Sequence, residues 1–255
     1  MTKINADWIV GFVDGDGFFG FSKDEKRFYF GASQDKRSVS VLYAMKTFFQ
    51  CGHVHKAGNN MREFKVCSKK HLIEKIIPFF KENPLQTSKQ QSFEQLANKL
   101  EPSKVLDIKD KSKTFSLQEK ALVAQKAKLT VDWLAGFIDA EGCFVCSIIN
   151  QTIRPQFIIG LNQIDKPILD KIKTDFNYGV RYVRKNSVEV FQLSSNKDMS
   201  AFARNIILTK SFGDRLKTDK RIRARKWCQI VFLMQRKQHQ TVQGFENIQK
   251  LYQIF

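Results

Sequence analysis

The sequence predicts an α+β protein built from two similar units, each with the order helix-strand-strand-helix-strand-strand-helix. Two observations support this fold class. Segments of the first half of the chain recur in the second half, so both halves are expected to fold alike. Within each half, stretches in which apolar and polar residues alternate lie between apolar helical stretches, which is typical of antiparallel sheets covered on one face by helices.

The internal repeat starts at Asp7 and Trp8, which return as Asp132 and Trp133, 125 residues later. Further along, the segment EFKVCSKK corresponds to VFQLSSNK. Two copies of so long a unit favour a pseudo-twofold pair of domains over a solenoid of short repeats. The expected organisation is an N-terminal unit over residues 1–100, a linker over 101–129 and a C-terminal unit over 130–255.

Each unit is expected to begin with an apolar helix, for which Asp7 and Asp132 are the predicted N-caps. A later helix in each unit is expected to stop at Gly52 or Gly179. Stretches in which apolar and polar residues alternate predict strands. The predicted strands are 18–22, 27–34, 53–57 and 63–68 in the first unit, and 143–149, 154–163, 180–185 and 188–195 in the second.

The chain is strongly basic, with 43 Lys and Arg against 25 Asp and Glu in 255 residues and a formal net charge of +18. Such an excess predicts a polyanionic partner, first nucleic acid and second an anionic membrane. The basic residues do not gather on one amphipathic helix, which argues against a membrane surface. The sequence contains no run of about 18 apolar residues, the length that a membrane span needs, so no membrane association is expected. The N-terminus lacks a secretory signal, so no secretion is expected.

The five cysteines are an odd number, which favours reduced thiols over a disulfide framework. Cys143 and Cys146 have C-x-x-C spacing, but on a strand their side chains would point to opposite faces. A zinc site at this pair is therefore not expected. His53 and His55 share one strand face and offer a weaker alternative metal pair, although hairpin residues are the simpler interpretation.

Two apolar helices end in the segments GFVDGDG and GFIDAEG, at corresponding positions of the repeat. A helix C-terminus carries partial negative charge, so acidic residues there are electrostatically unfavourable unless something else requires them. Gly11 and Gly136 occupy the same position in both helices, and a helical glycine costs about 1 kcal/mol relative to alanine. That cost is explained if the two helices cross at these glycines with their backbones in close contact.

The paired segments IVGFVDGDG and LAGFIDAEG resemble the motifs of the single-chain LAGLIDADG homing endonucleases. The resemblance covers nearly the whole chain: two motifs, two α-β-β-α-β-β-α units, a linker and a basic balance. It implies saddle-shaped antiparallel sheets, motif helices packed at the interface of the two units, and a monomer. It also implies a site-specific endonuclease that recognises a long asymmetric double-stranded DNA target and cuts both strands to leave 3′ overhangs.

The last acid of each motif, Asp16 and Glu141, is the predicted essential residue. Packed motif helices would bring these two carboxylates together, and a divalent cation would relieve their repulsion. Carboxylates and the exposed carbonyls of Gly15 and Ala140 are the oxygen ligands that Mg²⁺ prefers, and Ca²⁺ or Mn²⁺ would fit the same ligands. Asp14 and Asp139 lie two residues earlier, face elsewhere on their helices, and are expected to be structural, bonding backbone amides of the partner unit.

The resemblance also implies supporting catalytic residues. Gln34 and Gln163 are expected to close the second strand of each unit near a reactive water. The motif LxTxK, which occurs once in each half, supplies Lys89 and Lys220 to stabilise developing phosphate charge. Lys217 is an alternative to Lys220, and solvated helix-start lysines are an alternative to both roles.

Polar side chains on the sheet faces away from the helices are expected to read bases, because Arg, Lys and Gln are the side chains that bond base edges. In strand 18–22 Phe19 and Phe21 are expected to point to the helices and Ser22 away from them. The predicted DNA-binding residues are Ser22, Lys65, Ser147, Gln151, Arg154, Arg181 and Gln192. The segment 204–237 carries 11 basic and 2 acidic residues and is expected to contact phosphates.

Two other functions are compatible with the same sequence. One is a maturase that binds intron RNA and helps its host intron to splice, and the other is a descendant that binds DNA without cutting it. The survival of both acids favours the enzyme, because a binding-only protein is free to lose them. Frequent Lys, Asn and Phe are typical of AT-rich genomes, which indicates an organelle, mitochondrion or chloroplast.

Overall fold

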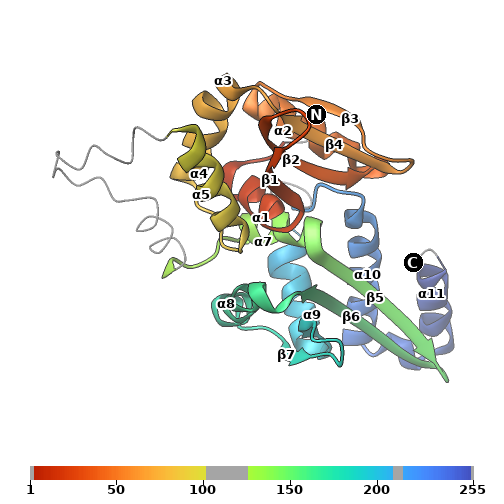
Figure 1. Cartoon of the computed structure of the whole chain (residues 1–255). Helices are drawn as coiled ribbons and strands as arrows, with labels where there is room; N and C mark the ends of the chain where they lie inside the picture. The colour runs from red at the N-terminus through yellow and green to blue at the C-terminus, as the bar shows by residue number, and fades with distance from the viewer. Residues whose placement is uncertain (1–2, 102–125, 209–214, 254–255) are drawn as a thin grey trace. The chain divides into compact units, whose positions relative to one another are not determined.

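The computed structural model describes residues 3–101, 126–208 and 215–253, which divide into two compact units, Met1–Ala140 and Glu141–Phe255 (Figure 1). Most of the predicted linker, residues 102–125, lies outside the described residues. The second motif helix packs with the first unit and ends on Glu141, the first residue of the second unit. Every helix within the described ranges is too short or too polar to cross a lipid bilayer.

Unit 1 contains a four-stranded antiparallel sheet in the order β1-β2-β4-β3. Helices α2 and α5 pack on one face of this sheet, where Phe19 of β1 lies 5.6 Å from Phe93 of α5 and Phe30 of β2 lies 5.8 Å from Phe49 of α2, measured between ring centroids. Its elements are α1 (Ala6–Asp16), β1 (Gly17–Ser22), β2 (Arg27–Asp35), η1 (Lys36–Ser38), α2 (Val39–Phe49), β3 (His53–Lys56), β4 (Met61–Val66), α3 (Lys69–His71), η2 (Leu72–Ile76), α4 (Ile77–Glu82), α5 (Lys89–Leu100) and α7 (Val131–Glu141).

Unit 2 repeats the topology with a sheet in the order β5-β6-β8-β7. Phe144 of β5 lies 5.5 Å from Trp227 of α10, and Phe157 of β6 lies 4.9 Å from Phe202 of α9. Its elements are β5 (Gly142–Ile149), β6 (Thr152–Leu161), η4 (Gln163–Asp165), α8 (Lys166–Phe176), β7 (Val180–Val183), β8 (Glu189–Leu193), α9 (Asn196–Phe202), η5 (Ala203–Ile207), α10 (Lys220–Gln235), η6 (Gln238–Gln240) and α11 (Val242–Tyr252).

The predicted strands and the α+β class are confirmed, but each unit has helices that the sequence did not predict. In unit 1 the segment Lys69–Glu82 forms α3, η2 and α4, and buries Leu72, Ile76 and Phe80. These residues are spaced as on one helix face, but Pro78 interrupts the pattern at the start of α4, after the π-helical turn η2. Unit 2 has α9 and η5 in the corresponding place and adds α11 at its end.

The helices α2 and α8 end earlier than predicted. Gln50 and Asn177 follow their last turns in the left-handed conformation, with φ of 50° and 54°. Gly52 and Gly179 come two residues later, also with positive φ, at the entry to the next strand. The glycines therefore shape the turn into the hairpin and do not end the helix itself.

Candidate functional site

The motif helices α1 and α7 each begin one residue before the predicted cap. The side chain of Asn5 accepts a hydrogen bond from the backbone N–H of Trp8, and Thr130 Oγ1 accepts one from Trp133 N at 3.0 Å. Asp7 and Asp132 thus lie in the first turns and are not the N-caps. Asn5 Nδ2 also donates to Asp132 Oδ2 at 2.7 Å and so joins the two helix starts.

The two motif helices cross at their glycines, as the sequence predicted. A Cβ atom on Gly11 would lie 1.9 Å from the carbonyl oxygen of Trp133, and one on Gly136 would lie 2.0 Å from that of Trp8. Real Cβ atoms essentially never approach so closely, and a helix backbone cannot move aside as a flexible side chain can. Glycine is therefore required at both positions by the crossing.

Asp14 and Asp139 hold the motif helices together. Trp8 Nε1 donates to Asp139 Oδ2 at 3.1 Å, and Trp133 Nε1 donates to Asp14 Oδ2 at 2.9 Å, so each indole bonds the acid of the other motif. Both acids are buried. The predicted structural role is confirmed, and each acid accepts a hydrogen bond from the indole of the other motif helix.

Asp14 also receives backbone amides, from its own half of the chain. Its carboxylate accepts hydrogen bonds from Gln86 N, Thr87 N and Thr87 Oγ1 at 2.7 to 3.1 Å. Burial raises the pKa of Asp14 to about 6, although the bonds from Thr87, Trp133 and Gln86 act in the opposite direction. At neutral pH Asp14 is therefore an ionised acid surrounded by donors.

In unit 1 the structure brings four predicted site residues together at the end of α1. Gln34 Nε2 donates to Asp16 Oδ2, and Lys89 Nζ donates to the carbonyl oxygen of Gly15. Asp16, Gln34 and Lys89 are all half-buried. An acid, an amide and an ammonium group thus lie together at the C-terminal end of α1. They can bind a cation, hold a carboxylate in one orientation and neutralise negative charge.

The motif LxTxK positions this lysine. Leu85 is fully buried, and Thr87 Oγ1 donates to both the carboxylate and the backbone carbonyl of Asp14. Lys89 follows as the first residue of α5, so it is fixed two residues from the buried threonine. The prediction for LxTxK named only the lysine, whereas the threonine repeated in both copies was the sequence signal for this anchor.

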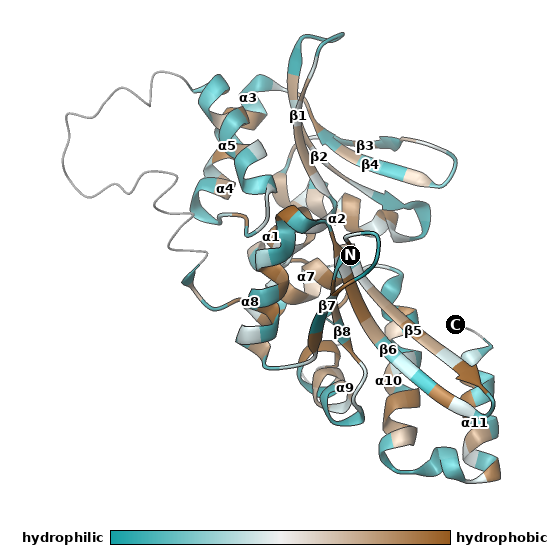
Figure 2. Ribbon diagram, turned by 60° about the horizontal axis from the view of Figure 1, so that its bottom comes forward, coloured by the Kyte–Doolittle hydropathy of each residue, from teal (hydrophilic) through white to brown (hydrophobic). Residues whose placement is uncertain are grey.

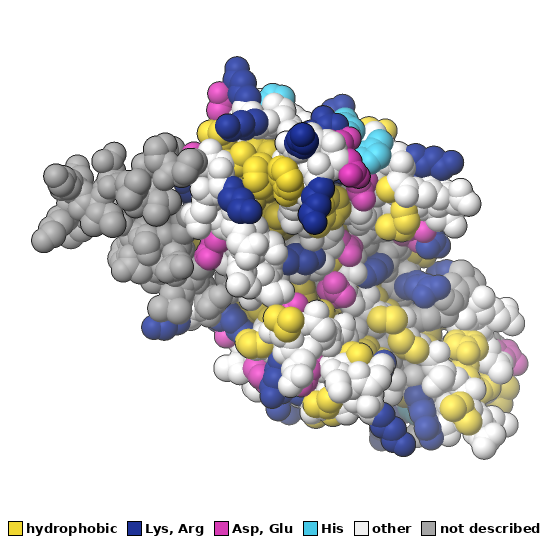
Figure 3. All heavy atoms as spheres, in the orientation of Figure 1, with side chains coloured by type: hydrophobic (Ala, Val, Ile, Leu, Met, Phe, Trp, Pro, Cys, Tyr) yellow, Lys and Arg dark blue, Asp and Glu magenta, His cyan; other side chains and the backbone are white. Residues whose placement is uncertain are grey.

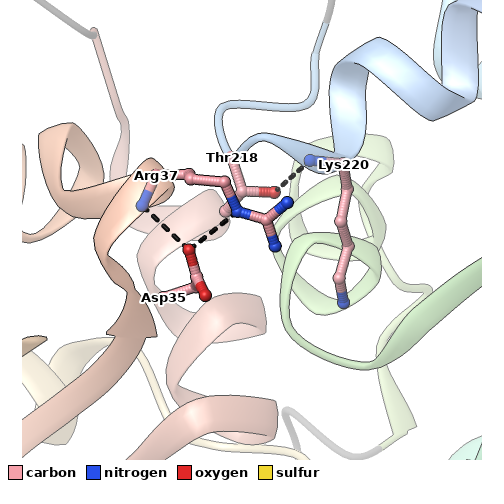
Figure 4. Close-up of polar contacts among 4 residues, drawn as sticks. All are labelled: Asp35, Arg37, Thr218 and Lys220. Atoms are coloured by element: carbon pink, nitrogen blue, oxygen red, sulfur yellow. Dashed lines mark hydrogen bonds and ion pairs between the residues drawn. The ribbon is translucent and has the colours of Figure 1, made fainter. Parts of the chain in front are cut away.

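In unit 2 the motif LxTxK has the same local geometry. Leu216 and Thr218 are buried, and Lys220 begins α10 with its backbone N–H donating to Thr218 Oγ1 at 3.3 Å (Figure 4). Glu141, at the end of α7, is half-buried. Among the residues that the structure describes, no hydrogen bond to its carboxylate is found.

Gln163 does not lie where Gln34 lies. Strand β6 ends at Leu161, and Gln163 begins the short helix η4 with its side chain exposed. The prediction that Gln163 closes the second strand is therefore wrong. The prediction aligned Gln163 with Gln34, but the residue at the corresponding position of β6 is Leu161, two residues earlier.

Each sheet has an open face, which we define as the side turned away from the helices that cover it. In unit 1 the register places Ser22 and Lys65 on this face, as predicted. Lys65 Nζ lies 4.5 Å from the centre of the Tyr29 ring, a cation–π contact. The other polar strand residues of this face are Arg27, Ser33, Asp35, His53, His55 and Glu63.

Two close polar contacts hold side chains on this open face. His55 Nε2 lies 3.4 Å from Glu63 Oε2, and the His53 and His55 rings are 5.2 Å apart. At the end of β2, Asp35 accepts from the backbone N–H and from Nε of Arg37, both at 2.9 Å (Figure 4). The described residues contain no group of three His, Cys, Asp or Glu side chains arranged to hold a metal ion, so the two histidines do not form a closed metal site.

The open face of unit 2 is less polar. The register places Ser147, Arg154 and Gln192 on it, as predicted, and Gln151 in the turn between β5 and β6. Apolar residues share this face, and Figure 2 shows β5 mostly in the hydrophobic colours. The apolar residues of this open face include Val145, Ile149, Ile158, Val180 and Tyr182.

Arg181 does not lie on the open face. Its register partner is Phe191, a buried residue on the helix side of the sheet. Its Nε lies 2.6 Å from Asp170 Oδ1 of α8, and its Nη1 lies 2.9 Å from Glu189 Oε2. Arg181 therefore serves the internal packing of unit 2, and the prediction that it points outward is wrong.

Other charged and sulfur-containing groups fit the sequence predictions. Lys and Arg side chains are scattered over the face seen in Figure 3 and do not gather in one patch there. The five cysteines, all in the described part of the chain, form no disulfide there. Cys143 is exposed and Cys146 is buried, on opposite faces of β5, which excludes a joint zinc site.

The donor set at the end of α1 suits a hard divalent cation. Asp16 offers a carboxylate. The Gly15 carbonyl oxygen accepts a hydrogen bond from the positively charged ammonium group of Lys89, so it already faces a cation. Mg²⁺ is commonly bound by one or two carboxylates together with substrate phosphates, whereas zinc requires several nitrogen or sulfur ligands. The oxygen donors therefore fit Mg²⁺ better than zinc.

The fold is shared with solved endonuclease structures. The I-SmaMI LAGLIDADG homing endonuclease bound to cleaved DNA has a TM-score of 0.79 and 21% sequence identity, with 98% of this chain and 96% of that chain covered. The LAGLIDADG meganuclease I-AabMI bound to uncleaved DNA has a TM-score of 0.75 and 23% identity, with 97% and 98% covered.

Curated relatives cover parts of the chain. "Probable intron-encoded endonuclease 4" of Neurospora crassa is 28% identical over 62% of this chain and 27% of its own length. "Probable intron-encoded endonuclease Cox1-I1b" of Schizosaccharomyces pombe is 31% identical over 54% of this chain and 41% of its own length. The chain thus matches less than half the length of these relatives.

A family model connects these findings with the repeat. The model of the LAGLIDADG endonuclease matches twice, over residues 9–99 and 134–231. These two ranges contain both acidic motifs and both copies of LxTxK. The chain therefore belongs to the LAGLIDADG endonuclease family.

Proposed function

We propose that this protein is a homing endonuclease that recognises a long asymmetric DNA site and hydrolyses both strands, leaving 3′ overhangs. The observation that carries the proposal is the meeting of Asp16, Gln34 and Lys89 at the end of the first motif helix. A protein that only bound DNA would have no need for an acid held by an amide beside a lysine that binds the same helix end. The second motif keeps an acid, Glu141, and the lysine Lys220 in the corresponding places.

The reaction requires groups that bind, orient and neutralise. The carboxylates of Asp16 and Glu141 and the carbonyls of Gly15 and Ala140 would hold Mg²⁺, or Ca²⁺ or Mn²⁺ in its place. When bound, such an ion neutralises phosphate charge and makes a water molecule more acidic. The ammonium groups of Lys89 and Lys220 would stabilise the negative charge that develops on the phosphate as the bond to the leaving oxygen breaks.

The open faces would read the DNA target. Ser22 and Lys65 in unit 1, and Ser147, Arg154 and Gln192 in unit 2, are side chains able to bond base edges, with Gln151 at the turn beside them. Lys65 and Gln192 occupy equivalent strand positions but differ in charge, which supports an asymmetric target. Because one chain carries both faces, a monomer suffices.

The cellular setting is proposed from the relatives. The Schizosaccharomyces pombe relative is named after a cox1 intron, and a Saccharomyces cerevisiae relative, 23% identical over 96% of this chain, is named a mitochondrial protein. We therefore place this protein in a mitochondrion, encoded within an intron. Its target would be the same gene without that intron.

The test is cleavage of a plasmid that carries the intron-free host gene, with Mg²⁺ and with EDTA. Cleavage into linear DNA with Mg²⁺ only, at one site and with 3′ overhangs, is the expected result. Asp16→Asn and Glu141→Gln should each bind the site and fail to linearise it. Tight binding to the intron RNA without DNA cleavage would replace the proposal by a splicing role, and cleavage unaffected by both substitutions would remove these acids from the reaction.

A further inference from the structure

The glutamine that supports the acid of unit 1 has no counterpart in unit 2. The register pairs Gly17, which follows Asp16, with Ala32, and pairs Gly142, which follows Glu141, with Ile159. Two residues beyond these partners stand Gln34 in β2 and Leu161 in β6. Leu161 thus occupies the strand position from which Gln34 donates to Asp16.

The next turn confirms this correspondence. Asp35 follows Gln34 and caps η1, and Asn162 follows Leu161 and caps η4, each through its side chain. Helices α2 and α8 then start directly after these 3-10 turns. The same number of residues separates Gln34 from the start of α2 and Leu161 from the start of α8, so the register cannot shift Gln163 into the place of Gln34.

The remaining parts of the centre are repeated. Both copies have an acid at the end of the motif helix, a buried threonine, and a lysine that begins the following long helix. The copies differ in the amide and in the acid itself, because Glu141 has one more rotatable bond than Asp16. A longer side chain without a fixed donor loses more conformational freedom when it takes up a single orientation.

We propose that the two acids are unequally oriented, so that the endonuclease cuts one DNA strand faster than the other. Gln34 is a positioning residue that holds one carboxylate oxygen of Asp16, and Leu161 is the reason that Glu141 lacks this support. The inference rests on the proposed nuclease function. One hydrogen bond to a charged group corresponds to roughly a tenfold difference in rate or more, so the nicked intermediate should accumulate.

The experiment measures both strands separately on a target duplex labelled at each 5′ end, under single-turnover conditions. Gln34→Leu should slow only the faster strand, by about tenfold, and Leu161→Gln should accelerate only the slower strand. Gln163→Leu is the matched control and should change neither rate. Equal rates for both strands in the unaltered protein, or a loss on one strand with Gln163→Leu, would overturn the inference.

A second measurement does not depend on activity. In the metal-free chain, the side-chain amide signals of Gln34 in a nitrogen-proton NMR spectrum should shift when Asp16 is changed to Asn. Leu161→Gln should add an amide pair that responds to Glu141→Gln. Amide signals indifferent to both acids contradict the positioning role, whereas complete failure of cleavage with intact amide contacts contradicts only the proposed function.

Discussion

Two acids of the first motif, separated by one glycine, have different environments. Side chains two positions apart on a helix point in different directions. Asp14 is buried and accepts hydrogen bonds from Thr87, Gln86 and Trp133, whereas Asp16 is half-buried and contacts Gln34. The same residue type therefore stabilises the fold at one position and stays accessible for chemistry at the other.

Replacing Asp14 should destabilise the protein strongly. Asp14→Ala leaves the donors of Thr87, Gln86 and Trp133 buried without an acceptor, and several lost bonds to a charged group should together lower the free energy of unfolding by at least about 3 kcal/mol. Chemical denaturation measures this change. Asp24→Ala, at an exposed turn, is the control and should stay within about 0.5 kcal/mol, and a similar effect of both would contradict the assignment.

His53 should make the folded protein less stable as the pH falls. Desolvation, and next the neighbouring His55, lower the pKa of His53 below its ordinary value. A histidine with a lowered folded-state pKa contributes stability above its unfolded pKa, and that contribution is lost as pH falls through the folded pKa. His53→Gln should therefore lose less stability than the unaltered chain as pH decreases from about 7 to 5. Identical losses in urea denaturation across this range would contradict the prediction.

At the scale of elements, the motif helices α1 and α7 are joined along their whole length. Their backbones meet at two glycines, their starts are joined by Asn5 and Asp132, and their acids accept each other's indole groups. The bonds repeat in reciprocal positions because the sequence of the motif is itself repeated. Closeness of the backbones, and not helix propensity, explains the glycines.

Adding one methyl group at this crossing should be costly. Gly11→Ala places a Cβ atom against the carbonyl of Trp133, and overpacking of this kind costs about 1–3 kcal/mol or more. Gly58→Ala is the matched control, since only Met61 Cβ at 3.9 Å lies near the added atom. Thermal unfolding should show a lower midpoint for Gly11→Ala alone, and an unchanged midpoint would mean that the helices can separate without penalty.

At the scale of the whole molecule, one topology carries two chemically different open faces. The open face of unit 1 holds Arg27, Lys65, Glu63 and two histidines, whereas that of unit 2 is largely apolar around Arg154. Charged side chains suit guanine and cytosine edges, and apolar side chains suit the thymine methyl group. The half of the target that contacts unit 1 is therefore expected to contain more guanine and cytosine, and the half that contacts unit 2 more thymine.

Thymine methyl groups should matter in only one half of the target. Replacing thymine by deoxyuridine in the half read by unit 2 should weaken binding several-fold, because an apolar contact to a methyl group is lost. The same replacement in the other half should have little effect. Tyr182→Ala should remove the sensitivity to uracil, and Lys65→Ala should leave it intact, as measured by fluorescence anisotropy. Equal losses in both halves would contradict this assignment.

The sequence predicted those features that depend on local pattern. The strands, the glycine crossing and the two motif acids follow from periodicity and repetition. Gln163 was misplaced because β6 ends two residues earlier than predicted, at Leu161. Arg181 was misplaced because a change of one residue along a strand turns a side chain to the other face. Pairing partners such as Phe191 are distant in sequence, so no local pattern of β7 could show which side Arg181 faces.

The anchoring of LxTxK to the motif helix affects how such a protein can change over generations. A substitution at Thr87 or Asp14 disturbs folding, and selection would remove it together with any DNA binding. Substitutions at Asp16, Gln34 or Lys89 leave these anchors intact, so the chain can lose cleavage and still fold. Descendants that have become pure binding proteins should therefore keep the threonine and the first acid of the motif while the second acid drifts.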